Sequence, residues 1–340
     1  MPEEKAGSGE KDKLFGLIDL DYRYDLAKHK FILKLLKSRW LPLLIIILNV
    51  FIFTIILTAG FVGGFSAGNY NFGIMIVWIL WWVLLMIVLV PVFARFWCMV
   101  CPFPLFSDWF QRGNLFGVLK GKLRSMNIKW PKSLKNMWIM NFFFLFTTFF
   151  SGFFTVRPLA TFILLSLIIL LAFIIGLLFE KRIFCLYLCP VSGFQGLFAQ
   201  FAMSEIRARD PSICKKHTPK SCYVGNDCGY GCPWLVLPFE FQKNTYCGMC
   251  LECFKTCEYD NMSFNLRPPG VDLLVDTKRE PKGLDEAWKG FIMLGCAIAF
   301  YMSFQSHFGV IKDMANAASL KGYLIYISVL TTFCLLLLPG

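Results

Sequence analysis

The chain has 340 residues, of which 57% are hydrophobic and only 16% are charged. A soluble domain could not bury so much apolar surface, so the composition favours a membrane protein. The net charge of +12 could indicate a nucleic-acid-binding protein. However, the basic excess flanks the apolar runs, whereas 205–286 is nearly balanced. The expected partner of the basic residues is therefore the lipid membrane and not nucleic acid.

Apolar runs recur along the chain at the length of membrane-spanning helices. No Asp, Glu, Lys or Arg occurs between Arg39 and Arg95, which leaves room for two spans and a short turn. Further charge-free stretches cover 136–156, 158–179, 290–311 and 322–340. Each has about 20 residues, enough for a helix to cross roughly 30 Å of hydrocarbon. We expect an α-helical membrane protein with about six transmembrane helices.

The positions of Lys and Arg predict the orientation of these helices. Five basic residues precede the first span, and more lie between Arg95 and Lys135, whereas 60–73 has no charge. Basic loops stay on the cytoplasmic side. We therefore expect a multi-pass protein of the cytoplasmic membrane, with its N-terminus and its hydrophilic insert in the cytoplasm.

The same patterns predict four regions. We expect a cytoplasmic N-terminal segment at 1–40, a four-helix membrane core at 41–190 and a C-terminal helix pair at 289–340. Between them, 191–288 combines an amphipathic segment with a small module rich in Cys, Pro, Gly and Asn, inserted between helices four and five. The amphipathic part, 194–207, is expected either to lie on the membrane surface or to be an ordinary loop helix packed on the module.

Two cysteine pairs mark a weak internal repeat. The second predicted helix ends in Cys98-Met99-Val100-Cys101-Pro102, and the fourth ends in Cys185-Leu186-Tyr187-Leu188-Cys189-Pro190. In each unit, two predicted helices are followed by a Cys…Cys-Pro ending. Because the two units have the same orientation, the two cysteine pairs should lie at the same depth in the membrane. Cys98, Cys101, Cys185 and Cys189 could therefore form a single site. A third iron–sulfur cluster, another soft metal, redox thiols and unliganded turns all remain possible.

The run from Cys247 to Cys257 is the strongest motif. Cys247, Cys250, Cys253 and Cys257 follow the C-x2-C-x2-C-x3-C spacing of bacterial ferredoxins, in which the fourth cysteine serves a neighbouring cluster. Zinc sites usually use two well-separated pairs, so this spacing favours [4Fe–4S]. A reducing cytoplasm also favours metal ligation over disulfides.

The partner cysteines lie upstream with looser spacing: Cys214, Cys222, Cys228 and Cys232, the last followed by proline. In two-cluster ferredoxins, the distant cysteine is commonly followed by proline. We infer that Cys232 joins Cys247, Cys250 and Cys253 on one cluster. The other cluster would use the remaining four cysteines, Cys214, Cys222, Cys228 and Cys257. His217 could replace Cys214, although a solvated surface histidine is the simpler interpretation.

With these motifs, the chain resembles the membrane-bound polyferredoxins of the NapH, NosR and CcoG type. The resemblance covers roughly residues 40–265 and depends on the Cys-Pro helix ends and the ferredoxin run. It departs from the family in its C-x2-C first pair and in the two helices predicted after the module. Members of that group oxidise quinol, feed electrons to a partner reductase or help to mature a metalloenzyme.

Three functions remain open from the sequence. The first is an electron-transfer subunit of an oxidoreductase complex, with an α+β ferredoxin-like module that holds two clusters. It would pass electrons between a membrane donor such as quinol and other redox subunits. The second is an assembly factor that reduces a metal ion or cofactor of another enzyme. The third is a structural membrane protein with zinc in its cysteine sites.

Overall fold

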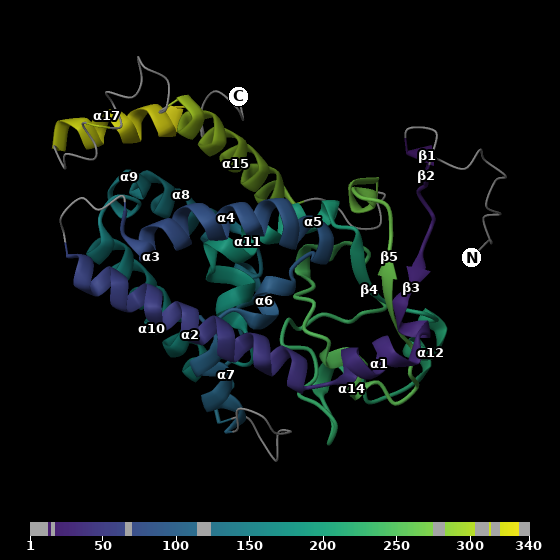
Figure 1. Ribbon diagram of the computed structural model, residues 1–340. Helices are drawn as coiled ribbons and strands as arrows, with labels where there is room; N and C mark the ends of the chain where they lie inside the picture. The colour runs from purple at the N-terminus through teal and green to yellow at the C-terminus, as the bar shows by residue number, and fades with distance from the viewer. Residues whose placement is uncertain are drawn as a thin grey trace.

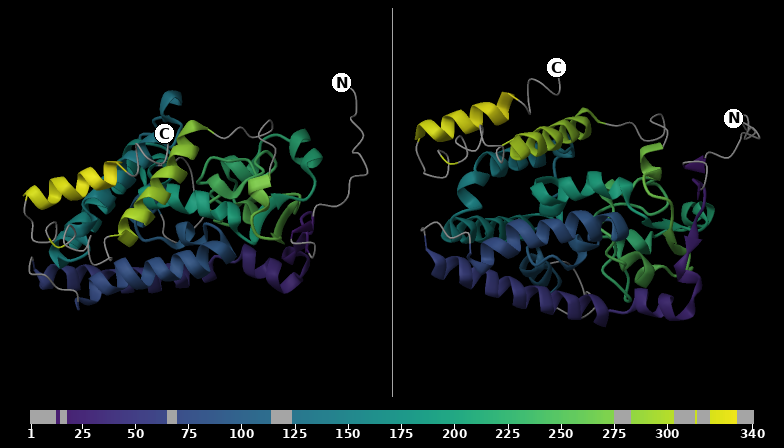
Figure 2. Two further views of the ribbon diagram at one scale, coloured as in Figure 1. Left: turned by 90° about the horizontal axis from the view of Figure 1, so that it is seen from above. Right: turned by 45° about the horizontal axis from the view of Figure 1, so that its top comes forward.

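The computed structural model describes residues 13–14, 18–64, 70–113, 124–274, 283–302, 313 and 320–332. This part of the chain is mostly helical. The cysteine-rich segments gather at one end around a small sheet, and the long apolar helices extend away from it (Figures 1 and 2).

Three helices in the described residues are long and apolar enough to cross a membrane. They are α2 (Trp40–Gly63), the continuous helix Phe72–Phe93 and α10 (Pro158–Leu178). The second consists of α3 (Phe72–Ile74), a wide π-helical turn at Met75–Leu80, α4 (Trp81–Leu84), a second such turn at Leu85–Leu89 and α5 (Val90–Phe93).

These apolar helices approach closely where their side chains are small. A Cβ at Gly60 of α2 would lie 3.1 Å from Phe162 Cβ and 3.2 Å from Pro158 O of α10. Glycine at such a contact brings two backbones together in an apolar medium, where packing and not hydrophobic burial drives association.

The other predicted spans remain predictions. In place of one helix over 136–156, the structure has α8 (Trp138–Phe149) and α9 (Ser151–Phe154), which meet at Phe150. Near the C-terminus it has α15 (Leu284–Met302) and α17 (Leu320–Thr331). Parts of the predicted spans 290–311 and 322–340 lie outside the described residues.

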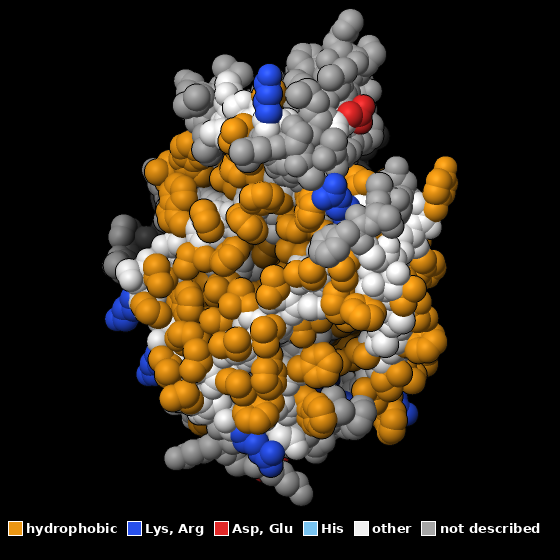
Figure 3. Space-filling model, turned by 90° about the vertical axis from the view of Figure 1, so that its left-hand side faces the viewer, with side chains coloured by type: hydrophobic (Ala, Val, Ile, Leu, Met, Phe, Trp, Pro, Cys, Tyr) orange, Lys and Arg blue, Asp and Glu red, His pale blue; other side chains and the backbone are white. Residues whose placement is uncertain are grey.

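The surface also fits a lipid environment. Hydrophobic side chains cover most of the face shown in Figure 3, with Lys and Arg at its edges. On α2, Leu44 is 61% exposed and Phe51 is 63% exposed. A soluble protein rarely leaves so large an apolar area uncovered, so the helices are consistent with a membrane protein.

The cysteine-rich end contains a three-stranded antiparallel sheet in the order β3 (Tyr24–Asp25), β5 (Met262–Leu266), β4 (Ser204–Ala208). β1 (Lys13–Leu14) and β2 (Ile18–Asp19) form a separate pair. The remaining α-helices of the described residues are α1 (Lys30–Lys37), α6 (Phe96–Val100), α7 (Leu105–Arg112), α11 (Pro190–Phe198), α12 (Pro211–Lys216), α13 (Ser221–Val224) and α14 (Glu252–Thr256).

The N-terminal segment is part of this sheet. Tyr24 pairs with Leu266 across β3 and β5. Arg209 Nε lies 2.9 Å from Asp25 Oδ2, so an ion pair reinforces the strand pairing. Residues that we assigned to a separate N-terminal region therefore help to build the cysteine-rich module.

The predicted amphipathic segment 194–207 is not a single helix in the structure. Helix α11 ends at Phe198, a 3-10 turn follows at Ala199–Phe201, and Arg207 lies in strand β4. Phe194 and Gln195 are both buried, because α11 packs against α8 and α15. This helix belongs to the interior and not to the membrane surface.

Candidate metal centres

Four cysteines from two distant segments stand at helix ends; Cys98, Cys101, Cys185 and Cys189 are called here the helix-end group. Cys98 lies in α6 and Cys101 follows it in extended backbone. Cys185 lies in the wide turn Phe184–Leu188, and Cys189 follows, again in extended backbone. Proline comes next in both cases, and the residue before a proline is driven out of the helical conformation. The sequence therefore ends each helix at its second cysteine.

The thiols of this group are neighbours. Burial raises the pKa of the Cys185 thiol well above its ordinary value, and Cys189, Cys101 and Cys98 raise it further, while Arg182 opposes them. Burial also raises the pKa of Cys189 to about 11. Cys98, Cys185 and Cys189 also belong to one cluster of buried residues, so these three thiols lie in the same part of the structure. A metal centre there would stabilise the thiolates, since its positive charge reverses this balance.

Arg182 and Arg95 lie near the helix-end group and bond to backbone carbonyls and to side chains of neighbouring segments. Arg182 donates to Cys98 O at 2.7 Å and to Asp108 Oδ2 at 2.6 Å. Arg95 donates to Thr245 O and to Ser192 Oγ. These cations hold the segments that carry the cysteines and add positive potential around four thiols.

Lys289 of α15 was not among the site residues predicted from the sequence, and burial lowers the pKa of its amine to about 7. It is fully buried, and within the described residues its Nζ has no hydrogen-bond partner. Nζ lies 4.1 Å from the centre of the Phe144 ring and interacts electrostatically with Cys189. An isolated buried ammonium is costly unless an anion balances it. A cluster bound by four thiolates would supply that negative charge, so the residues present fit such a group.

In the module, Cys232, Cys247, Cys250 and Cys253 line one small cavity and form the first module group. Burial raises the pKa of Cys247 to about 11 and that of Cys250 to about 12. Backbone N–H groups oppose this rise: Met249 donates to Cys247, and Trp234 and Val236 donate to Cys232. Such N–H···S bonds stabilise cluster thiolates and tune their reduction potential.

The second module group contains Cys214 of α12, Cys222 of α13 and Cys257 at the end of α14, which line another small cavity. Asn261 donates from its backbone to Cys257 Sγ and from its side chain to Cys214 Sγ, both at 3.3 Å. Three of the four cysteines predicted for this cluster are thus together. The fourth, Cys228, is exposed and does not line the cavity.

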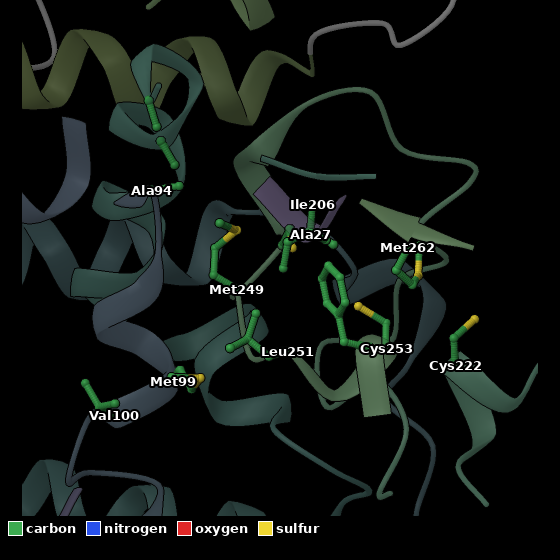
Figure 4. Packing of buried hydrophobic residues seen from close by; sticks show 14 residues of the cluster. Ala27, Ala94, Met99, Val100, Ile206, Cys222, Met249, Leu251, Cys253 and Met262 are labelled. Atoms are coloured by element: carbon green, nitrogen blue, oxygen red, sulfur yellow. The ribbon is translucent and has the colours of Figure 1, made fainter. Parts of the chain in front are cut away.

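The three groups follow one another through the structure. A cavity of about 260 Å³ is lined by both Cys101 of the helix-end group and Cys250 of the first module group. Cys222 is close enough to Cys253 to raise its pKa, although burial is the largest cause of that rise. Figure 4 shows Cys253 within one hydrophobic cluster that also contains Met99 and Val100 of α6, and Cys222 at the edge of this cluster.

Within the described residues, no three His, Cys, Asp or Glu side chains converge as they would around a single metal ion.

Comparison with known proteins supports this chemistry. A family model described as a 4Fe-4S binding domain matches residues 74–126 and 162–209. Each matched stretch contains one cysteine pair of the helix-end group. No curated protein and no solved structure matches the chain. The match supports the prediction of an iron–sulfur protein, while the ferredoxin-spaced run lies outside the matched residues.

Proposed function

We propose that the chain is a membrane-anchored electron-transfer protein with three iron–sulfur clusters, which carries electrons between quinol and a partner redox protein. The observation that carries this proposal is the succession of three cysteine groups, linked by shared cavities and packing. When bound, each cluster supplies one-electron chemistry, and the residues of the chain set its potential and exclude water.

The arrangement in the membrane is part of the proposal. Six helices would span the cytoplasmic membrane, with the N-terminal segment and the two-cluster module in the cytoplasm. The three long apolar helices and the basic residues beside them support it. A partner subunit on that side would exchange electrons with the module.

The cavity between Cys101 and Cys250 has the chemistry of a quinol headgroup site. Trp40, Leu43 and Ile46, from the first turns of α2, give it an apolar wall. Asp108 also lines it; this residue is 6% exposed, and its Oδ1 has no hydrogen-bond partner among the described residues. That carboxylate oxygen can accept a hydrogen bond from a hydroxyl, while Arg182 holds the other oxygen.

The test uses the purified chain in detergent without oxygen and a short-tailed quinol as the donor. We expect the quinol to bleach the visible absorbance of the clusters. Leu43→Trp should slow that bleaching at least tenfold, because the larger side chain fills the cavity. Leu44→Trp, on the 61%-exposed position of the same helix, is the matched control and should behave as the native chain.

If the clusters reduce with dithionite but never with quinol, the quinol assignment is wrong. A Leu43→Trp rate equal to that of Leu44→Trp would place the donor somewhere other than this cavity.

A further inference from the structure

His217 lies beside the second module group. It follows α12 directly and lines the same cavity as Cys214, Cys222 and Cys257. Its ring is half-buried and packs on Tyr259, with the ring centres 4.8 Å apart. The side chain therefore stands at the cysteine site and not free in solvent.

The hydrogen bond of the His217 ring determines which nitrogen can bind a metal. Nδ1 lies 2.9 Å from the carbonyl oxygen of Ile213. Because a carbonyl can only accept, Nδ1 carries the proton in this bond and Nε2 keeps its lone pair. A metal-ligating histidine usually donates its other ring N–H to such a carbonyl.

The backbone around His217 is also held in place. Lys220 Nζ donates to His217 O at 2.7 Å and to Cys214 O. One ammonium thus ties the histidine and the first cysteine of the group to each other. Cys214 and His217 are three residues apart at the end of one helix, a spacing that lets both reach a common ligand.

Cys228 is held away from this cavity. It lies in the turn between the bridged residues Asn226 and Gly229, and its backbone N–H donates to Asn226 Oδ1 at 3.0 Å. Arg39, at the start of α2, donates to Cys228 O. These bonds fix the turn while the cysteine is exposed.

We propose that the second module group is a Cys3His site, in which His217 Nε2 and not Cys228 supplies the fourth ligand of a [4Fe–4S] cluster. This proposal depends on the proposed function only in requiring that the module binds clusters. A neutral imidazole replaces an anionic thiolate, so the cluster accepts an electron more readily. Histidine ligation raises the potential of Rieske centres in the same direction.

The test compares His217→Ala with Cys228→Ser in the full-length chain, purified anaerobically. Iron and acid-labile sulfide are measured per chain, together with EPR spectra before and after reduction. We expect Cys228→Ser to keep the native iron content. His217→Ala should lose about four irons if the whole cluster is lost. If only the iron bound by His217 is lost, the variant should lack about one iron and show a [3Fe–4S] signal in the oxidised protein. Cys257→Ser is the reference for loss of this cluster.

A second variant separates ligation from folding. His217→Cys should retain the native iron content and shift the midpoint potential of one cluster to a more negative value, because a thiolate adds negative charge. A histidine that only packs against Tyr259 would leave that potential unchanged, and this result would overturn the proposal.

Loss of the cluster in Cys228→Ser, or native iron content in His217→Ala, would also overturn it. Either result leaves the proposed electron-transfer function intact. A native chain without any iron would contradict both.

Discussion

The indole of Trp234 occupies the space that a side chain at position 248 would need. A Cβ added to Gly248 would lie only 1.8 Å from Trp234 Nε1. Gly248 stands inside the loop that carries Cys247 and Cys250, and Trp234 follows Cys232-Pro233. The contact therefore joins the two segments of the first module group at a point where only glycine fits.

Gly248→Ala should abolish the cluster of the first module group, because Trp234 or the cysteine loop must move to accommodate the methyl group. We expect a loss of about four irons per chain, the same as for Cys250→Ser. Iron and sulfide analysis measures it. Gly290→Ala is the matched control, since a Cβ at that position meets nothing within 4 Å. Equal iron in both alanine variants would contradict the role of this contact.

The helix-end group should behave as one shared site. Cys98→Ser and Cys185→Ser should each lose the iron of one cluster, because a cluster that lacks a ligand from either cysteine pair is destabilised. The double variant should lose no more iron than each single variant. Iron analysis of the three variants checks this. Additive losses would indicate two separate sites, and unchanged iron would leave these cysteines as thiols.

Lys289 should tune the cluster that we propose at the helix-end group. Lys289→Met keeps the length of the side chain but removes the buried amine near Cys189, which an anionic cluster at the helix-end group would keep protonated. We expect one midpoint potential to become more negative in an EPR redox titration, because a nearby cation favours the reduced cluster. Lys321→Met, at an exposed position of α17, is the control and should leave every midpoint potential unchanged.

The orientation of the helices can be measured with reporter fusions. Fusions after Tyr70 and after Arg157 should report the extracytoplasmic side, and fusions after Lys132 and after Asp260 should report the cytoplasm. A fusion after Asp260 that reports the outside would place the module in the wrong compartment for the proposed electron route.

Local patterns in the sequence predicted much of the candidate sites. The Cys-Pro pairs end their helices as expected, because proline acts on its immediate neighbour. The ferredoxin spacing of Cys247, Cys250 and Cys253 agrees with the cavity that they share with Cys232. These signals depend on residues a few positions apart, which the sequence displays directly.

Features that depend on distant contacts could not be predicted. Nothing local to Tyr24 shows that it pairs with Leu266, and nothing local to Lys289 shows that α15 brings it to Cys189. The burial of α11 likewise depends on α8 and α15. Cys228 has a thiol that could bind a metal, but the turn in which it lies keeps it exposed. His217, which the sequence indicated to be a surface residue, lines the cavity of the second module group.

We propose that this chain carries three iron–sulfur clusters. The most direct measurement is the iron, zinc and acid-labile sulfide content of the native chain purified without oxygen, with EPR after reduction by dithionite. We expect about twelve irons and as many sulfides per chain, together with interacting EPR signals of reduced cubanes. Stoichiometric zinc without sulfide, and no EPR signal on reduction, would contradict it.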